Sequence, residues 1–173
     1  MEPVRFERIA ADDQAAVEAL SALASKIVKE HYDPIIGPEQ NDYMIERYQS
    51  VSSLKGQMEE GCRYYMTWGP QGPMGFFAVR EEADGVLFLS KFYLKKECRR
   101  QGVGRRQLAF IESLAVKAGR DRIRLTVNKG NAGSIEAYRH LGFSVVKPVC
   151  TDIGQGFVMD DYLMEKKLER FGN

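Results

Sequence analysis

The sequence predicts an α/β fold built on one mixed sheet, with antiparallel strands first and a parallel pair after them. Two observations carry this prediction. Three strand-like runs, at residues 62–68, 74–81 and 86–94, follow one another with short turns between them, which is typical of an antiparallel meander. The third run leads into an amphipathic helix and then into an apolar strand-like run, and such a strand–helix–strand unit makes a right-handed parallel crossover.

The N-terminal part is predicted to hold one strand and three helices. Residues 4–9 alternate between apolar and polar side chains, which is typical of a short strand. Asp12 or Asp13 can cap a helix with apolar residues at helical spacing, and the segment 31–34 is expected to end it. The elements expected next are a loop at 36–38, a helix at 40–49 and a helix at 52–60 that Gly61 closes.

The C-terminal part is predicted to alternate helices and strands. The expected elements are a helix at 103–118, a strand at 123–127, a helix at 133–141 and strands at 143–150 and 157–168. The first of these helices carries an apolar stripe that includes Leu108, Ile111 and Ala115, and Gly119 ends it. No repeat, low-complexity tract or break in composition divides the chain, so residues 1–173 are expected to form a single domain.

Composition limits the function classes. The chain has 173 residues and a formal net charge of +1, so its overall charge gives no reason to expect binding to nucleic acid or to a membrane surface. Three cysteines without a Cys-x-x-Cys pair, and two distant histidines, indicate neither a disulfide framework nor a metal site. The sequence shows no signal peptide and no apolar run of about 18 residues. A cytoplasmic protein without a bound metal is therefore expected.

The most informative segment is the turn at residues 99–105, which lies between a strand-like run and a helix-like run. Helix N-termini attract anions because their first N–H groups lack partners and carry a partial positive charge. Gly102 and Gly104 let the backbone approach a pyrophosphate, and Arg99, Arg100 and Arg105 add bidentate donors. The alternative is a solvated basic rim, but the glycines and the helix start favour a phosphate site.

This turn differs from two common nucleotide motifs. The Gly-x-x-x-x-Gly-Lys-Ser/Thr run of a Walker loop is absent from the sequence. The dinucleotide fingerprint lacks its third glycine, because Gln107 stands three residues past Gly104. Two adjacent parallel strands that diverge beside such a turn suit a long, thin ligand with a pyrophosphate better than a compact nucleotide.

Two segments, taken together, carry a family resemblance. The first is the run Phe92-Tyr93-Leu94 followed by the turn Arg99-Arg100-Gln101-Gly102-Val103-Gly104. The second follows the pattern Asn-x-x-Ser-Ile-x-x-Tyr-x-x-x-Gly-Phe from Asn131 to Phe143. They are similar to the pyrophosphate turn and the following cofactor segment of the GNAT superfamily of acetyl-CoA-dependent N-acetyltransferases. Both motifs occur in order with one strand between them, which makes the resemblance specific.

The resemblance implies a GNAT-like fold, with helices on both faces of the sheet and the parallel pair splayed around acetyl-CoA. It implies that the backbone of the turn holds the pyrophosphate, that the third strand of the meander flanks the pantetheine arm, and that the second motif contacts the arm from the other side. The residues implied for the cofactor are Phe92, Tyr93, Leu94, Arg99, Arg100, Gln101, Gly102, Val103, Gly104, Arg105, Asn131 and Ser134.

Tyr138 is the catalytic residue that the resemblance implies. When an amine attacks the thioester, the CoA sulfur leaves as a thiolate, and a nearby phenol can donate a proton to it. A phenol has a pKa of about 10, so it is protonated at neutral pH. Without the motif, Tyr138 would be read as a core aromatic on the same helix face as Ile135.

The group that deprotonates the amine is harder to identify. Many relatives carry a glutamate at a position that corresponds to the neighbourhood of Ser90, but no acid occurs here between Gly85 and Lys96. Glu81 and Glu82, on the neighbouring strand, could act through a water molecule, although simple solvation of these acids is the alternative. A backbone carbonyl or a chain of water molecules would also serve, since binding the amine already supplies proximity.

The acceptor is expected to be a small cationic amine such as a polyamine. Residues 157–166 are similar to the ending of polyamine-acetylating members, and Tyr32 and Asp33 are expected to hold a cation. Asp160 and Asp161 are interpreted as an exposed strand edge in preference to a substrate contact. Peptide or protein N-termini and amino acids are alternative acceptors. A non-catalytic acyl-CoA-binding module, or a partner-binding domain without CoA, is the alternative class, and a homodimer is the candidate assembly because dimers are common among relatives.

Overall fold

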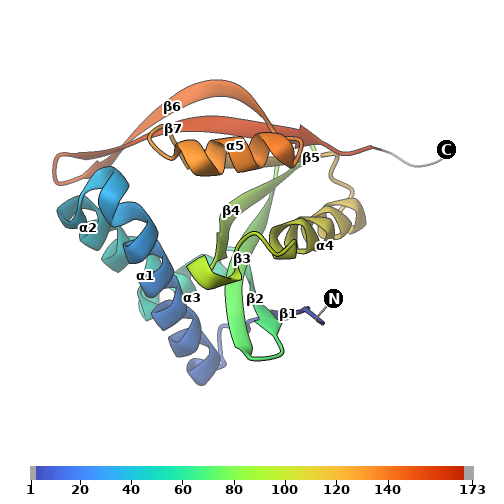
Figure 1. The fold of residues 1–173 in the computed structure, drawn as a ribbon, viewed down its shortest axis with the longest axis horizontal. Helices are drawn as coiled ribbons and strands as arrows, with labels where there is room; N and C mark the ends of the chain where they lie inside the picture. The colour runs from blue at the N-terminus through green and yellow to red at the C-terminus, as the bar shows by residue number, and fades with distance from the viewer. Residues whose placement is uncertain (1–2, 170–173) are drawn as a thin grey trace.

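A seven-stranded mixed sheet organises the computed structural model, which describes residues 3–169 (Figure 1). The strands lie in the order β1-β2-β3-β4-β5-β7-β6, and only β4 and β5 pair in parallel. The elements are β1 (Arg5–Arg8), α1 (Gln14–Ile36), α2 (Pro38–Gln49), α3 (Val51–Glu59), β2 (Arg63–Gly69), β3 (Gly72–Glu82), β4 (Val86–Leu94), the 3-10 turn η1 (Lys96–Cys98), α4 (Val103–Lys117), β5 (Arg122–Asn128), α5 (Ala132–His140), β6 (Ser144–Gly154) and β7 (Phe157–Lys167). This arrangement confirms the predicted mixed sheet and its parallel pair.

Helix α1 ends later than the sequence predicted, and the predicted stop at residues 31–34 is wrong. Pro34 removes only the N–H that would bond to the carbonyl of Glu30, and the helix continues to Ile36. The backbone N–H of Gly37 donates to the carbonyl of Asp33 and closes the helix. The side chain of Asn41 in α2 donates to Asp33 and to the carbonyl of Val28, which ties the last turns of α1 to α2. Tertiary contacts therefore outweigh the local cost of the proline.

The remaining boundaries differ from the prediction by a few residues. Helix α2 begins two residues early because Pro38 suits the first turn of a helix, where its missing N–H costs nothing. Strand β6 runs to Gly154, four residues past the predicted end at residue 150, because it pairs with β7 along its length.

The two faces of the sheet carry separate apolar clusters. On one face, α1 and α3 cover a cluster that includes Leu20, Tyr64 and Phe76. On the other face, α4 and α5 cover a cluster that includes Leu89 and Ile111. Figure 1 shows the three N-terminal helices on one side of the sheet and α4 on the other. This confirms the expectation of helices on both faces.

The parallel pair opens after three residue pairs. Val86 to Phe88 of β4 pair with Arg122 to Arg124 of β5, and no pairing joins the two strands beyond that point. Strand β4 then follows β3 to Leu94, while β5 follows β7 to Asn128, so the two strands diverge. Ser90 is an extra residue in β4, because Ala78 pairs with Lys91 and Val79 pairs with Leu89. The unpaired strand edges in this opening position the candidate site.

Within residues 3–169, none of the helices is both long enough and apolar enough to span a membrane.

Candidate active site

The turn after β4, which is the predicted phosphate site, lies at one end of the opening. Arg100 and Gly102 both take left-handed backbone conformations, with φ of 62° and 80°. Gly102 is the N-cap of α4 and supplies no side-chain cap, so the first N–H groups of the helix are left for another partner. The Nε of Arg99 donates to the carbonyl of Leu94 at 3.2 Å, which holds the turn against the end of β4. The segment predicted to bind phosphate is therefore a bend that leads directly into a helix N-terminus.

The fit of this turn to a bulky anion can be tested at its glycines. A Cβ placed on Gly102 would meet no atom within 4 Å, so the space above that residue is open. A Cβ on Gly104 would meet only Leu94 Cδ1, at 4.0 Å. Burial, and after it the charge of the nearby Arg99, lower the pKa of the imidazole of His31, which lies on the last part of α1. The residues present thus fit a pyrophosphate, with space and positive charge around free backbone donors.

Tyr138 lies inside the opening, on α5. Its ring stacks on Phe92 of β4 at a centroid distance of 6.1 Å and meets the edge of Phe143 at 5.8 Å. Burial, followed by the nearby Tyr32, raises the pKa of the Tyr138 phenol well above its usual range. The hydroxyl is therefore protonated at neutral pH and can act as a donor.

Tyr138 belongs to a cluster of three tyrosines that come from different elements. Tyr32 of α1 and Tyr93 of β4 meet edge to face, with ring centroids 6.5 Å apart. Burial is the first cause of a raised pKa in both of them, and each phenol affects the other. The cluster crosses the opening between β4 and α5 and reaches α1.

Asn131 links this cluster to the start of α5. Its side chain is 4% exposed, and its Oδ1 accepts from the backbone N–H of Ser134 at 3.3 Å as the cap of the helix. Its Nδ2 donates to the hydroxyl of Tyr32 at 3.2 Å. Asn131 therefore fixes both the N-terminus of α5 and the ring of Tyr32. Ser134 lies in the first turn of α5, which Asn131 caps.

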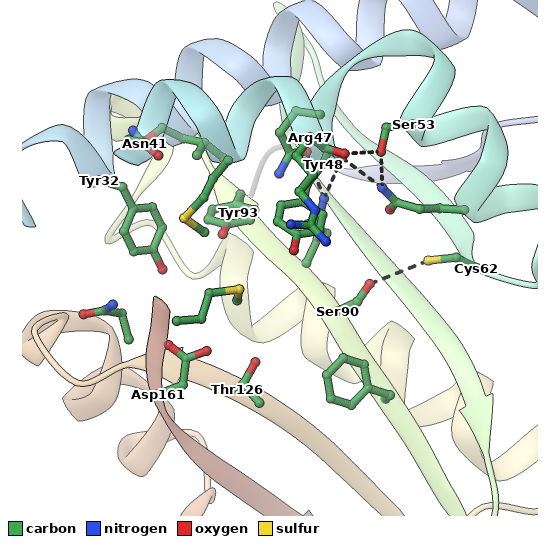
Figure 2. A pocket seen from close by; sticks show the side chains of 18 of the residues that line it. Tyr32, Asn41, Arg47, Tyr48, Ser53, Cys62, Ser90, Tyr93, Thr126 and Asp161 are labelled. Carbon is green, nitrogen blue, oxygen red and sulfur yellow. Dashed lines mark hydrogen bonds between the residues drawn. The ribbon is translucent and has the colours of Figure 1, made fainter. Parts of the chain in front are cut away.

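A cavity of about 720 Å³ occupies the other side of the opening, between α1–α3 and the sheet (Figure 2). Its size suits a small molecule. Its lining includes Tyr32, Arg47, Tyr48, Gln49, Glu60, Cys62, Arg80, Ser90, Lys91, Tyr93, Thr126 and Asp161. Tyr32 and Tyr93 belong both to this wall and to the tyrosine cluster, so the cavity adjoins the side of the opening that holds Tyr138.

The bulge in β4 turns two polar residues toward this cavity. The hydroxyl of Ser90 lies 3.6 Å from the thiol of Cys62, whose pKa burial raises. The Nζ of Lys91 donates to Gln49 Oε1 at 2.9 Å and to the carbonyl of Tyr48 at 3.4 Å. It also lies 5.7 Å from the centre of the Tyr64 ring. Burial lowers the pKa of Lys91 to about 8, so its ammonium is still mostly protonated at pH 7.

Asp161 is the buried carboxylate of the cavity lining, which also includes the exposed Glu60, and the interpretation of Asp161 as part of an exposed strand edge is wrong. It is 7% exposed, whereas its neighbour Asp160 is exposed and pairs with Lys129 at 2.9 Å. Burial and the charge of Asp160 raise the pKa of Asp161 to about 6. Figure 2 shows Asp161 and Thr126 on the strand side of the cavity, facing Arg47 and Tyr48 on the helix side. The alternation of β7 supplied the missed signal, since Met159 and Asp161 share one face and Val158 and Asp160 share the other.

The structure brings together only some of the residues predicted for the acceptor. Tyr32 and Ser90 line the cavity. Asp33 lies outside it, where it pairs with Lys29 at 3.0 Å and accepts from Asn41. Glu81 lies on the opposite face of the sheet, beside Arg63 at 3.6 Å and Arg120 at 3.5 Å. Strand alternation explains this position, because Arg80 faces the cavity and its neighbour must face away.

Among residues 3–169, no group of three or more histidine, cysteine or acidic side chains is placed to hold a metal ion. The three cysteines are free.

Comparisons with known proteins agree with this geometry. The model of the acetyltransferase (GNAT) family matches residues 25–143. Among solved structures, the PaiA N-acetyltransferase of Thermoplasma acidophilum, in complex with coenzyme A, has a TM-score of 0.76 and 22% identity, over 95% of this chain and 99% of that one. A GCN5-related N-acetyltransferase from Rhodopseudomonas palustris has a TM-score of 0.74 and 16% identity, over 97% and 96%. Nourseothricin acetyltransferase has a TM-score of 0.58 and 24% identity, over 64% and 68%. No curated protein matches the chain.

Proposed function

Because this chain belongs to the GNAT family, and is therefore an acetyl-CoA-dependent N-acetyltransferase, we propose that it acetylates a small primary amine bound in the cavity between α1–α3 and the sheet. One observation carries the proposal: the opening of β4 from β5 has an anion-binding turn and Tyr138 on one side and the 720 Å³ cavity on the other. Donor and acceptor can thus approach the same strand edges from opposite sides. All seven strands join one sheet, which supports a single catalytic domain.

For the donor, we propose the residues predicted from the sequence. The free N–H groups at the start of α4, together with Arg99, Arg100 and Arg105, would hold the pyrophosphate. The strand edge at Phe92 to Leu94 has no partner on the β5 side, so an extended arm can lie along it. Asn131 would contribute by fixing the first turn of α5, since both polar atoms of its side chain are engaged within the chain.

For the chemistry, we propose that Tyr138 is the proton donor. Acetyl-CoA supplies a thioester carbonyl to the attacking nitrogen and a thiolate as leaving group. The raised pKa of Tyr138 keeps its phenol protonated, and stacking on Phe92 beside the strand edge fixes its orientation. The Tyr138→Phe variant should therefore lose at least tenfold in kcat while its affinity for acetyl-CoA changes little. An unchanged kcat in single-turnover measurements would remove the role of Tyr138 as an acid.

A small cationic amine is supported by the single buried carboxylate of the cavity, Asp161, which can hold an ammonium. A polyamine is one candidate of this kind, and peptide N-termini and amino acids are the others. The deciding experiment is a thiol-release assay with acetyl-CoA across polyamines, ω-amino acids, α-amino acids and short peptides. Thiol release with no amine in the panel, despite tight binding of acetyl-CoA, would instead favour a non-catalytic CoA-binding module.

For the assembly, we propose a homodimer formed through β6. This strand is the outer strand of the sheet, and Val145 and Val146 on it are 37% and 53% exposed. An exposed edge with apolar side chains favours pairing with a second copy. Light scattering should give twice the mass of one chain, and a Val146→Lys variant should give a monomer. A monomeric wild-type chain would refute this proposal.

A further inference from the structure

We infer that the acceptor amine also carries an anionic group, such as a carboxylate: Asp161 holds the ammonium, and Lys91 with Arg47 holds the anion on the other side of the cavity. The inference rests on the proposed function, because it names the substrate class of the same site. It follows from the charges on the cavity wall. Among residues 3–169, Lys91 and Arg47 form no ion pair with an acid, and Asp161 forms none with a base, although the charge of Lys129 acts on it. Glu60 also lines the cavity, but it is exposed to solvent and pairs with neither cation.

Lys91 is the main evidence for the anion. Its partners are a side-chain amide oxygen, a backbone carbonyl and an aromatic ring, all of which are neutral. Within residues 3–169, no carboxylate lies within 4 Å of its ammonium. A buried charge is costly unless an opposite charge accompanies it. The ammonium has three donors, and its two hydrogen-bond acceptors leave one donor for a ligand.

Arg47 adds a second cation on the same side. It lies on α2 one residue before Tyr48, whose carbonyl accepts from Lys91. Its guanidinium donates to the Tyr43 hydroxyl and to the carbonyl of Ile153, which are also neutral. Arg80 differs, because Glu82 neutralises it at 3.1 Å. The cations of the cavity wall that lack an acidic partner are thus Lys91, at the bulge of β4, and the exposed Arg47, near the end of α2.

Asp161 marks the opposite wall. Its position on β7 pairs with Asn128, the last residue of β5, so it lies where the opened strands end. No hydrogen bond to its side chain is found among the described residues, although 93% of the residue surface is covered. The charge of Asp161 also acts on Tyr32, which belongs to the cluster with Tyr138. An ammonium bound at Asp161 would therefore lie on the side of the cavity nearest the reacting groups.

The proton balance follows from these positions. Asp161 takes one proton from the bound ammonium and releases it to solvent. The neutral nitrogen then forms the new C–N bond as the C–S bond breaks, and the thiolate takes the proton of Tyr138. The second proton lost by the nitrogen restores the Tyr138 phenol. The products are an acetamide that keeps its anionic group and a free thiol.

A polyamine fits this wall less well. A diamine that placed one ammonium at Asp161 would direct its second ammonium toward Lys91 and Arg47. Like charges at close range in a cavity repel one another strongly, because little water screens them. The charges on the cavity wall therefore favour an amino acid over a diamine of similar length, although both carry the same reacting amine.

The test compares matched acceptors in the thiol-release assay: ω-amino acids of increasing length, their carboxamides, and diamines of the same length. For the best chain length, we expect kcat/KM of the amino acid to exceed that of its carboxamide and of the diamine by at least tenfold. Lys91→Met should abolish this preference, and Lys91→Arg should restore most of it. Lys26→Met removes the same charge from an exposed position on α1 outside the cavity, and should leave the preference unchanged.

A second measurement does not depend on turnover. A carboxylate without an amine, such as butanoate, should bind to the wild-type protein in calorimetry and should bind at least tenfold more weakly to Lys91→Met. Equal or better turnover of diamines by the wild type would overturn the inference and leave the proposed function standing. If Lys91→Met lowered kcat/KM equally for every acceptor, the inference would also be overturned, because Lys91 would then have a structural role only. Absence of thiol release with all amines would refute the proposed function itself.

Discussion

Replacing Lys91 with methionine should stabilise the folded chain at neutral pH, and this advantage should shrink in alkali. Burial lowers the pKa of Lys91 from 10.5 to about 8, so folding disfavours its charged form. One pKa unit corresponds to about 1.36 kcal/mol, which puts this cost at about 3 kcal/mol. Because the folded pKa is the lower one, the cost is complete below pH 8 and is gone above pH 10.5.

The pH dependence isolates this charge from the packing of the side chain. Lys91→Met also removes the hydrogen bonds to Gln49 and to the carbonyl of Tyr48, but that loss is the same at every pH. Between about pH 7 and pH 10, we therefore expect the stability of the variant relative to the wild type to fall by about 2–3 kcal/mol. Urea unfolding at the two pH values measures this change, with Lys26→Met as the exposed control. A stability difference that does not vary with pH would refute the account of Lys91 as a half-buried cation without an ion-pair partner.

Three further predictions concern the turn, the cavity and the sheet. The double variant Arg99→Ala, Gly104→Val should weaken acetyl-CoA binding at least tenfold by calorimetry, and unchanged affinity would contradict the assignment of the turn. Because the pKa of Asp161 is raised to about 6, its carboxylate forms only above that pH, so kcat/KM should fall below about pH 6. The Asp161→Asn variant should lose most of the activity, and its remaining kcat/KM should no longer fall below about pH 6. A fall in kcat/KM that persists below pH 6 in this variant would show that another group causes it. Gly75→Ala should cost about 2–3 kcal/mol in thermal or urea unfolding, because its Cβ would lie 2.2 Å from the carbonyl oxygen of Tyr93. Gly56→Ala, in α3 with no atom within 4 Å of the new Cβ, should instead be neutral or stabilising by up to about 1 kcal/mol, and similar effects at both glycines would contradict the close approach at Gly75.

The elements that the sequence predicted correctly depend on local patterns. Short strand-like runs with turn residues between them marked the strands of the meander, and the glycines of the turn at 99–105 marked the start of α4. The Tyr138 prediction came from a motif, and the structure places that residue against Phe92 in the opening of the sheet. These signals are short in sequence, so a single chain can carry them.

The features that could not be predicted depend on contacts between distant segments. Helix α1 passes Pro34 because Asn41 of α2 supports its last turns, and no local signal contains that contact. Asp161 is buried because α1 and α2 cover the end of β7, whereas the pair Asp160–Asp161 alone resembles a solvated edge. The bulge at Ser90 exists only relative to β3, so its effect on Lys91 could not be derived from β4 alone.

The extra residue in β4 also decides which face of the sheet each later side chain of the strand points to. Before Ser90, the even-numbered positions face α1–α3, as Phe88 does; after it, the odd-numbered positions do, as Tyr93 does. The same inversion turns Phe92 toward Tyr138. Deleting one residue here would leave the composition of the strand almost intact and exchange the side chains presented to donor and acceptor. Under the proposed function, the sides of β4 on which donor and acceptor bind thus depend on the number of residues in that strand as well as on their chemistry.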